Sequence, residues 1–284
     1  SAAYRLLPLL PQRGHQENGG QMDSRIGIIA GGGELPLLLN EALARKGLSP
    51  FLFPVLGSAS EGLLSQGKTI DLLHLEEGLA VVHSQGIRRV ILAGQVNHSL
   101  ALGSLPEEVK TLINEGGGGR SAMELFAILK RLFKRFDMEI VPYKDLLPEA
   151  FPAPGTLIGM PPCEEMGLDL SLGFKTARRM AELDIGQSVI TKKGLVVAVE
   201  ALEGTDRMID RAADLVGPGF SLVKVARPDQ DPAFDVPVVG PLTMEKLVRY
   251  KAAALGVEGG ETLFIDLPGC LEMARRSHIT VVAE

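Results

Sequence analysis

The chain has 284 residues, 45% of them hydrophobic and 23% charged, a composition typical of a folded protein with one large or two modest domains. Its formal net charge of −6 predicts no general attraction to nucleic acid or to an anionic membrane surface. Aromatic residues make up only 5% and tryptophan is absent, so few side chains could stack on bases. We therefore expect no nucleic-acid partner.

Cysteine, histidine and hydropathy patterns exclude several further classes. Cys163 and Cys270 are too few and too far apart to indicate a disulfide scaffold or a zinc site. The five histidines show no metal-ligand spacing. No window approaches the roughly 18 uninterrupted apolar residues of a membrane span, which predicts a soluble protein.

The first 21 residues contain a short apolar run that is too brief for the core of a secretion signal. Met22 stands directly before the first expected strand and has the position of a start residue. We interpret residues 1–21 as an N-terminal extension outside the fold.

The first expected strand, residues 26–30, continues into three glycines and then a helix at 35–46 with Pro36 in its first turn. Backbone amides at such a turn can bind an anion, which indicates a phosphate-bearing ligand. A dinucleotide fingerprint fails, because its third glycine would fall on Pro36. An NAD site is therefore disfavoured, and a turn without any ligand is the structural alternative.

Strands alternate with helices over the rest of this half. Further strands are expected at 50–55, 89–93 and 138–143, and helices at 75–85, 106–115 and 121–136. This pattern predicts a doubly wound, Rossmann-like parallel sheet. Ligands of such sheets bind at the carboxyl ends of the strands, which would place on one rim Gly31, Gly32, Gly33, Gly94 and Gln95.

Prolines are concentrated in residues 147–162, a stretch with neither helical nor strand periodicity. We interpret it as a linker between an N-terminal domain at 22–146 and a second, distinct α/β domain at 163–284. Helices are expected there at 173–183, 205–215, 243–255 and 270–276, and strands at 188–191, 195–201, 221–226, 262–266 and 280–282. Lys192, Lys193 and Gly194 would form a hairpin turn.

Two acidic segments of the second domain could carry chemistry. In the first, VEALEGTD at 199–206, Glu200 and Glu203 could enter one site only if the strand ends before Glu203. The alternative is that Thr205 or Asp206 caps the following helix and the glutamates are exposed.

The second acidic segment is the loop RPDQDPAFDVP at 227–237, which carries Asp229, Asp231 and Asp235 between prolines. Several carboxylates in a rigid loop can hold Mg²⁺ against a pyrophosphate, because hard cations prefer oxygen ligands. The same composition also makes ordinary turns.

Four segments occur in the same order in one known family: GIIAGGGELP at 27–36, LDIGQSVI at 183–190, VVAVEALEGTD at 196–206 and ARPDQDPAFDVPVVGP at 226–241. The chain resembles the two-domain UDP-2,3-diacylglucosamine pyrophosphatases of lipid A biosynthesis, the LpxI type. The resemblance extends from Met22 to the C-terminus.

The resemblance implies hydrolysis of an acylated sugar nucleotide to UMP and 2,3-diacylglucosamine 1-phosphate, with Mg²⁺ as cofactor and Mn²⁺ as a substitute. It places the catalytic aspartate at Asp235 and assigns further catalytic positions to Asp206, Glu203 and Gln230. From the residues themselves, we expect the metal ligands to be Asp235, Asp206 and Glu200, and the nucleotide to bind at Gly31, Gly32, Gly33, Gly94 and Gln95. The resemblance also implies a cytoplasmic homodimer that contacts the inner face of the inner membrane peripherally.

The chain departs from the family pattern at several charged positions. Ala233 stands where the family has Arg, Ala122 and Met123 replace an Asp pair, and His98 replaces another Arg. Arg binds phosphate through two hydrogen bonds that a smaller residue cannot replace. The alternative function is therefore a binder of a sugar nucleotide or acylated sugar phosphate with altered specificity or no catalysis.

Overall fold

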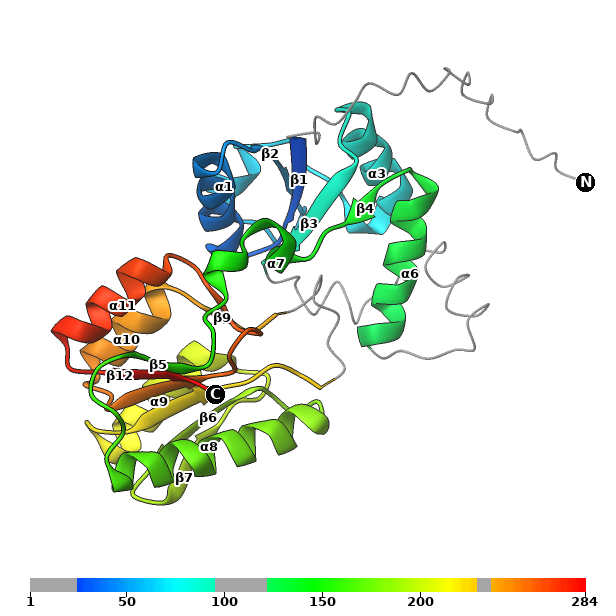
Figure 1. Ribbon diagram of the computed structural model, residues 1–284. Helices are drawn as coiled ribbons and strands as arrows, with labels where there is room; N and C mark the ends of the chain where they lie inside the picture. The colour runs from blue at the N-terminus through cyan, green and yellow to red at the C-terminus, as the bar shows by residue number, and fades with distance from the viewer. Residues whose placement is uncertain (1–24, 95–121, 229–235) are drawn as a thin grey trace, which may run out of the picture.

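The computed structural model describes residues 25–94, 122–228 and 236–284, with only the backbone described at 122–128. It has two α/β domains, each built around its own sheet (Figure 1). The mixed α/β class and the parallel first sheet that the sequence predicts are both confirmed. The helix expected at 106–115 and the glycine run at 116–119 lie outside the described residues.

The first domain contains a four-stranded parallel sheet in the order β2-β1-β3-β4. Its strands are β1 (Arg25–Ala30), β2 (Ser49–Pro54), β3 (Arg89–Ala93) and β4 (Glu139–Ile140). Its helices are α1 (Leu35–Arg45), α2 (Glu61–Leu64), α3 (Leu75–Ser84) and α6 (Ala122–Arg135), with a 3₁₀ turn at Leu72–His74.

Helices cover both faces of this sheet, as a doubly wound fold requires. On one face, Leu39 and Leu43 of α1 pack against Ile26 and Ile28 of β1. On the other face, α3 and α6 form a second buried cluster with Ile29. The strands are therefore apolar on both sides, which explains their nearly continuous hydrophobic sequences.

The strand expected at 138–143 is shorter in the structure. The Val141 amide still donates to the Val90 carbonyl, but Pro142 has no N–H to extend the ladder. The chain turns there into the short helix α7 (Tyr143–Leu146), where the Tyr143 hydroxyl donates to the Leu92 carbonyl.

The second domain contains a six-stranded mixed sheet in the order β5-β12-β10-β8-β6-β7. Its strands are β5 (Gly155–Ile158), β6 (Ser188–Lys192), β7 (Leu195–Val199), β8 (Ser221–Lys224), β10 (Ala254–Val257) and β12 (Thr280–Ala283). The central strands β8, β10 and β12 are parallel, whereas β5, β6 and β7 run antiparallel to their neighbours. The stretch expected to be a linker contains a strand, β5, which forms because these residues pair with β12. A 3₁₀ turn at Pro148–Ala150 precedes β5.

One long helix covers one face of this sheet and three shorter helices cover the other. Helix α8 (Glu164–Glu182) packs against β6, β8 and β10 through a cluster that includes Phe174 and Val223. The opposite face carries α9 (Thr205–Val216), α10 (Pro241–Arg249) and α11 (Leu267–Arg276).

The expectation of a helix over 243–255 is wrong at its C-terminal end. Helix α10 stops at Arg249, Lys251 adopts a positive φ of 53°, and residues from Ala254 form the central strand β10. A short apolar run fits a buried helix or a buried strand equally well by periodicity. Pairing with β8 and β12 decides the outcome here.

The β6–β7 hairpin turns at Lys193 and Gly194, as predicted, and both residues have positive φ. The buried Asp169 carboxylate of α8 accepts hydrogen bonds from the amides of Lys193 (3.0 Å) and Gly194 (2.7 Å). Helix α8 therefore holds the hairpin by its turn as well as by its apolar face.

A small parallel sheet of β9 (Val238–Val239) and β11 (Leu263–Phe264) lies where the two domains meet. Leu263 and Ile265 belong to the same buried cluster as Leu39 of α1. The carboxyl ends of β1 and β3 point toward the second domain (Figure 1). The ligand-binding edge expected for the first sheet therefore faces the other domain.

Both cysteines are free thiols, Cys163 exposed and Cys270 buried. Burial raises the pKa of Cys270 to about 12, with the Asp266 carboxylate adding to the effect, so this thiol stays protonated. Within the described ranges, none of the helices combines the length and the apolar character that crossing a membrane demands.

Candidate functional site

The triple-glycine turn of the first domain packs against the end of the neighbouring strand. The Gly31 amide donates to the Ala93 carbonyl at 2.7 Å. Gly94 has φ +86°, and a Cβ there would lie 2.4 Å from the Gly32 carbonyl oxygen. Gly31 to Gly33 and Gly94 therefore share one rim, as predicted, whereas Gln95 lies outside the described residues.

This turn exposes backbone at the start of α1. Gly33 has φ +87°, and a Cβ there would meet no atom within 4 Å. Among the described residues, no side chain caps the helix at its N-cap, Glu34. The positive end of an 11-residue helix favours an anionic group, so the rim can accept a phosphate.

The close approach of Gly94 to Gly32 gives a testable prediction. Gly94→Ala adds a backbone clash to the strain of a positive φ, so it is expected to lower the free energy of unfolding by about 2–3 kcal/mol. The control Gly33→Ala has the same φ but open space, and its expected cost is about 1 kcal/mol. Urea denaturation of both variants measures the difference, and equal losses would contradict the proposed contact.

The second domain gathers three distant segments at the carboxyl edge of β8. Ser188 opens β6 and pairs in register with Lys224, the last residue of β8. The Glu200 amide, directly after β7, donates to the Ser188 carbonyl at 2.9 Å. Two of these segments belong to the sequence motifs at 183–190 and 196–206, and Lys224 stands two residues before the motif at 226–241, so residues far apart in the chain meet at one edge of the sheet.

Their side chains form a hydrogen-bonded cluster. Lys224 Nζ donates to Thr205 Oγ1 at 3.0 Å, and that hydroxyl donates to Glu200 Oε1 at 2.8 Å. Ser188 Oγ lies 3.2 Å from the same hydroxyl. Glu200 and Lys224 are 9% and 8% exposed, so two opposite charges are buried on either side of Thr205. We call these four residues the Lys224 cluster.

Glu203 and Asp206, two predicted catalytic residues, lie outside the Lys224 cluster. Glu203 forms an ion pair with Arg211 on α9 and does not join the Lys224 cluster. Asp206 is exposed in the first turn of α9, where Lys246 Nζ contacts its backbone carbonyl at 3.3 Å. The alternative that Thr205 or Asp206 caps this helix is wrong, because the N-cap is Gly204 and no described side chain caps it.

A metal-binding group is not complete within the described ranges, where no three His, Cys, Asp or Glu side chains cluster closely enough. Glu200 and Asp206 are the predicted ligands that these ranges include. Asp235 and Gln230 fall in residues 229–235, outside them. Carboxylate oxygens suit a hard cation such as Mg²⁺, and the buried Glu200 Oε2 has no hydrogen-bond partner among the residues that the structure describes.

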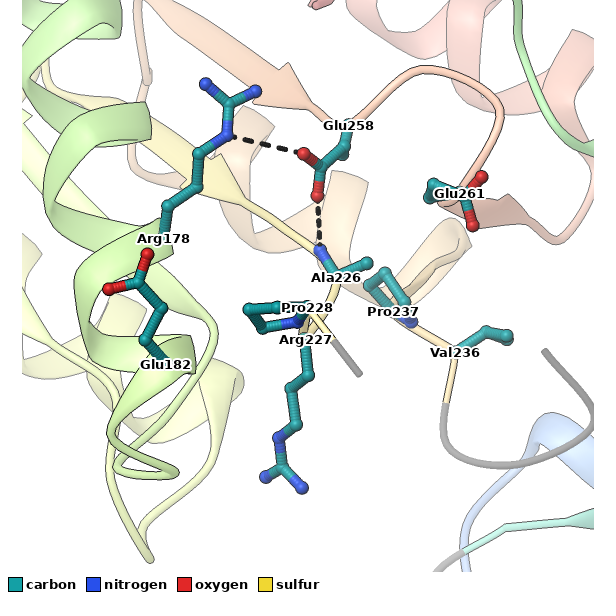
Figure 2. A pocket seen from close by; sticks show the side chains of 9 residues that line it. All are labelled: Arg178, Glu182, Ala226, Arg227, Pro228, Val236, Pro237, Glu258 and Glu261. Carbon is teal, nitrogen blue, oxygen red and sulfur yellow. Dashed lines mark hydrogen bonds and ion pairs between the residues drawn. The ribbon is translucent and has the colours of Figure 1, made fainter. Parts of the chain in front are cut away.

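A pocket of about 340 Å³ lies at the base of the acidic loop, between α8, the end of β8 and the turn after β10. Figure 2 shows its lining, which is Arg178, Glu182, Ala226, Arg227, Pro228, Val236, Pro237, Glu258 and Glu261. Pro228 and Val236 are the residues of this loop described immediately before and after 229–235. The pocket therefore adjoins the segment that carries Asp235.

Glu258 links two sides of this pocket by hydrogen bonds to Ala226 and Arg178. Its Oε2 accepts the Ala226 amide at 2.8 Å, and its Oε1 accepts Arg178 Nε at 3.3 Å. Arg227 points away from Glu258 (Figure 2) and pairs with Asp184 at 3.1 Å. Burial works to lower the pKa of Arg178, but the carboxylates of Glu284 and Glu258 outweigh it and hold that pKa above its usual value.

Sequence reasoning missed Lys224, Arg178 and Glu258. A signal existed for two of them, because Lys224 and Glu258 stand at the carboxyl ends of parallel strands. Arg178 carries no comparable signal, since it is one of several charged residues on a long helix.

Comparisons with known proteins agree with this architecture. The model of the LpxI N-terminal domain matches residues 25–150, and that of the LpxI C-terminal domain matches residues 153–282. A UDP-2,3-diacylglucosamine pyrophosphatase LpxI from Caulobacter vibrioides is 30% identical over 263 residues, which span 85% of this chain and 91% of that protein. Both domains and the stretch between them are therefore matched, and the chain belongs to the LpxI family.

Proposed function

We propose that this protein hydrolyses the pyrophosphate bond of UDP-2,3-diacylglucosamine, releasing UMP and 2,3-diacylglucosamine 1-phosphate for lipid A biosynthesis. The named activity of the Caulobacter relative supports this reaction. The observation that carries it is the meeting of two motif segments with the end of β8, which leads into a third motif, at the edge of the second sheet. The acidic loop continues from that same edge, at Pro228.

The diphosphate would lie between the two domains. The amides of the triple-glycine turn after Gly31, whose own amide donates to Ala93, would bind one phosphoryl group from the first domain. Asp206 and Asp235 would bind Mg²⁺ from the second domain, with Glu200 Oε2 as a further oxygen donor. The bound cation would neutralise the charge that develops on the diphosphate during phosphoryl transfer. Mn²⁺ has a similar preference for oxygen ligands and could replace it.

Glu203 and Gln230 would assist from beside this centre. Glu203 stands two residues before α9 begins, and its ion pair with Arg211 commits one carboxylate oxygen. Its role would therefore be to position the helix N-terminus, and a direct role would require that ion pair to open.

Exposed aliphatic side chains supply a surface for the acyl chains. Leu183 (71% exposed) and Ile185 (48%) precede β6, and Leu202 (94%) follows β7. Both connections lie at the edge that carries the Lys224 cluster, because Gly186 packs against the Glu200 carbonyl. These side chains could hold an acyl chain beside the diphosphate site or rest peripherally on the inner membrane.

The decisive experiment is an assay of UMP release from UDP-2,3-diacylglucosamine, with the products identified by mass spectrometry. We expect turnover with added Mg²⁺, loss of turnover with EDTA, and recovery when Mg²⁺ or Mn²⁺ is restored. Absence of UMP release under all metal conditions, together with measurable substrate binding, would instead support a binder without catalysis.

We also propose that the active form is a homodimer. Sedimentation equilibrium of the purified protein is expected to give twice the chain mass of 30.3 kDa. A monomer with full activity would reject this assembly without affecting the proposed reaction.

A further inference from the structure

Lys224 is a buried lysine with unused hydrogen-bonding capacity. Its side chain lies at the carboxyl end of β8 and is 8% exposed. An ammonium group has three N–H donors, and Thr205 Oγ1 accepts from it at 3.0 Å as its one side-chain partner among the described residues. Leaving a buried cation with unmet donors is costly, so this position calls for a further acceptor.

Glu200, on the other side of Thr205, has an acceptor oxygen without a donor among the described residues. Glu200 Oε1 accepts the Thr205 hydroxyl, but Oε2 is buried and has no partner in the described part of the chain. Across the ranges that the structure describes, Lys224 and Glu200 are joined through the hydroxyl rather than by a direct ion pair. A residue pair with a purely structural role would be expected to satisfy both charges directly.

Helix α9 adds a second reason for an anion at this place. Thr205 is the first residue of this 12-residue helix, whose N-cap is Gly204 with φ +81° and which no side chain in the described ranges caps. The positive end of the helix and the Lys224 ammonium therefore act in the same direction. Glu200 places a carboxylate on the other side of the Thr205 hydroxyl, to which both residues are hydrogen-bonded.

We infer that Lys224 is a substrate-binding residue. Its ammonium donates to a non-bridging phosphoryl oxygen of a diphosphate ligand, and the Thr205 hydroxyl and the Glu200 carboxylate hold the ammonium in position. This inference rests on the proposed function for the identity of the ligand. It adds a cationic contact from the second domain to the amide contacts of the first.

The test compares affinities for UDP and for uridine, which differ only in the diphosphate, by ligand-observed NMR titration. Lys224→Met keeps the length of the side chain and removes its charge. We expect roughly 10- to 100-fold weaker binding of UDP, as for loss of a charged hydrogen bond, and unchanged binding of uridine. A purely structural role would weaken both ligands together.

Lys192→Met is the matched control. Lys192 lies at the opposite end of β6, where its Nζ donates to the carbonyls of Val216 (2.6 Å) and Pro218 (2.7 Å). The substitution removes both hydrogen bonds of a lysine in the same sheet, so the free energy of unfolding should fall. The UDP affinity should be that of the wild type.

A second pair of variants tests the same inference if Lys224→Met does not fold. Thr205→Val removes the hydroxyl and should weaken UDP binding selectively, whereas Thr205→Ser keeps the hydroxyl and should retain it. Equal affinity of wild type and Lys224→Met for UDP, equal loss of both ligands, or a wild type without preference for UDP over uridine would overturn the inference. Failure of the wild type to release UMP, with Lys224-dependent UDP binding intact, would reject the proposed reaction alone.

Discussion

Gly186→Ala is expected to destabilise the second domain and to eliminate activity with it. A Cβ at this buried position would lie 2.2 Å from the Glu200 carbonyl oxygen and 2.8 Å from its carbonyl carbon. Both atoms belong to backbone that β6 holds through the 2.9 Å bond between the Glu200 amide and the Ser188 carbonyl. The backbone at Gly186 and the backbone at Glu200 cannot move apart without breaking that hydrogen bond.

The expected cost is at least 3 kcal/mol, or about 10 °C in the melting temperature of a domain of this size, because overpacking is combined with the loss of a buried hydrogen bond. Thermal unfolding followed by circular dichroism measures it. Gly167→Ala in α8 is the control of opposite sign, since a Cβ there meets no atom within 4 Å. That variant should gain about 0.5–1 kcal/mol from helix propensity, and an unchanged melting temperature of Gly186→Ala would refute the packing described here.

Asp235→Asn is expected to reduce the rate of UMP release on the order of 1,000-fold, the size of effect that accompanies the loss of an essential catalytic group. Asparagine preserves the size of the side chain and removes the charge that would hold Mg²⁺. The variant should therefore fold normally, with a melting temperature equal to that of the wild type, and should need more Mg²⁺ for its residual activity.

Asp231→Asn is the matched control, because it makes the same change within the same acidic loop. We expect less than about a 10-fold effect from it, since the proposed mechanism assigns Asp231 no role in the reaction. Steady-state kinetics over a range of Mg²⁺ concentrations separate the two variants. Full activity of Asp235→Asn, or an equal loss in Asp231→Asn, would reject the assignment of Asp235.

The Lys224 cluster offers a physical account of why the motif segments contain the residues they do. Gly186 lets the chain before β6 approach Glu200, and Gly204 reaches the positive φ from which α9 begins. Thr205 then reaches both Glu200 and Lys224. The two glycines and the threonine thus serve one arrangement, in which a buried cation is presented at a helix N-terminus.

Local sequence determined much of this protein. Apolar strands interrupted by glycine turns and amphipathic helices identified the parallel first sheet and the rim formed by Gly31 and Gly94. The Lys193–Gly194 hairpin turn could be predicted because it depends on local backbone preferences. The acidic motifs also directed attention to the segment that contains Glu200 and Thr205.

Tertiary structure decided what depends on partners distant in the chain. Residues 254–257 became a central strand because β8 and β12 lie on either side, and residues 155–158 became a strand because β12 had a free edge. Glu200 and Glu203 lie in different environments because Glu200 accepts a hydrogen bond from Thr205, whereas Glu203 forms an ion pair with Arg211. Lys224 became a binding candidate only when a strand end, a helix start and a buried carboxylate met around it. Periodicity and motifs report preferences of neighbours along the chain, whereas burial and hydrogen-bond partners are set by segments that meet only in the folded state.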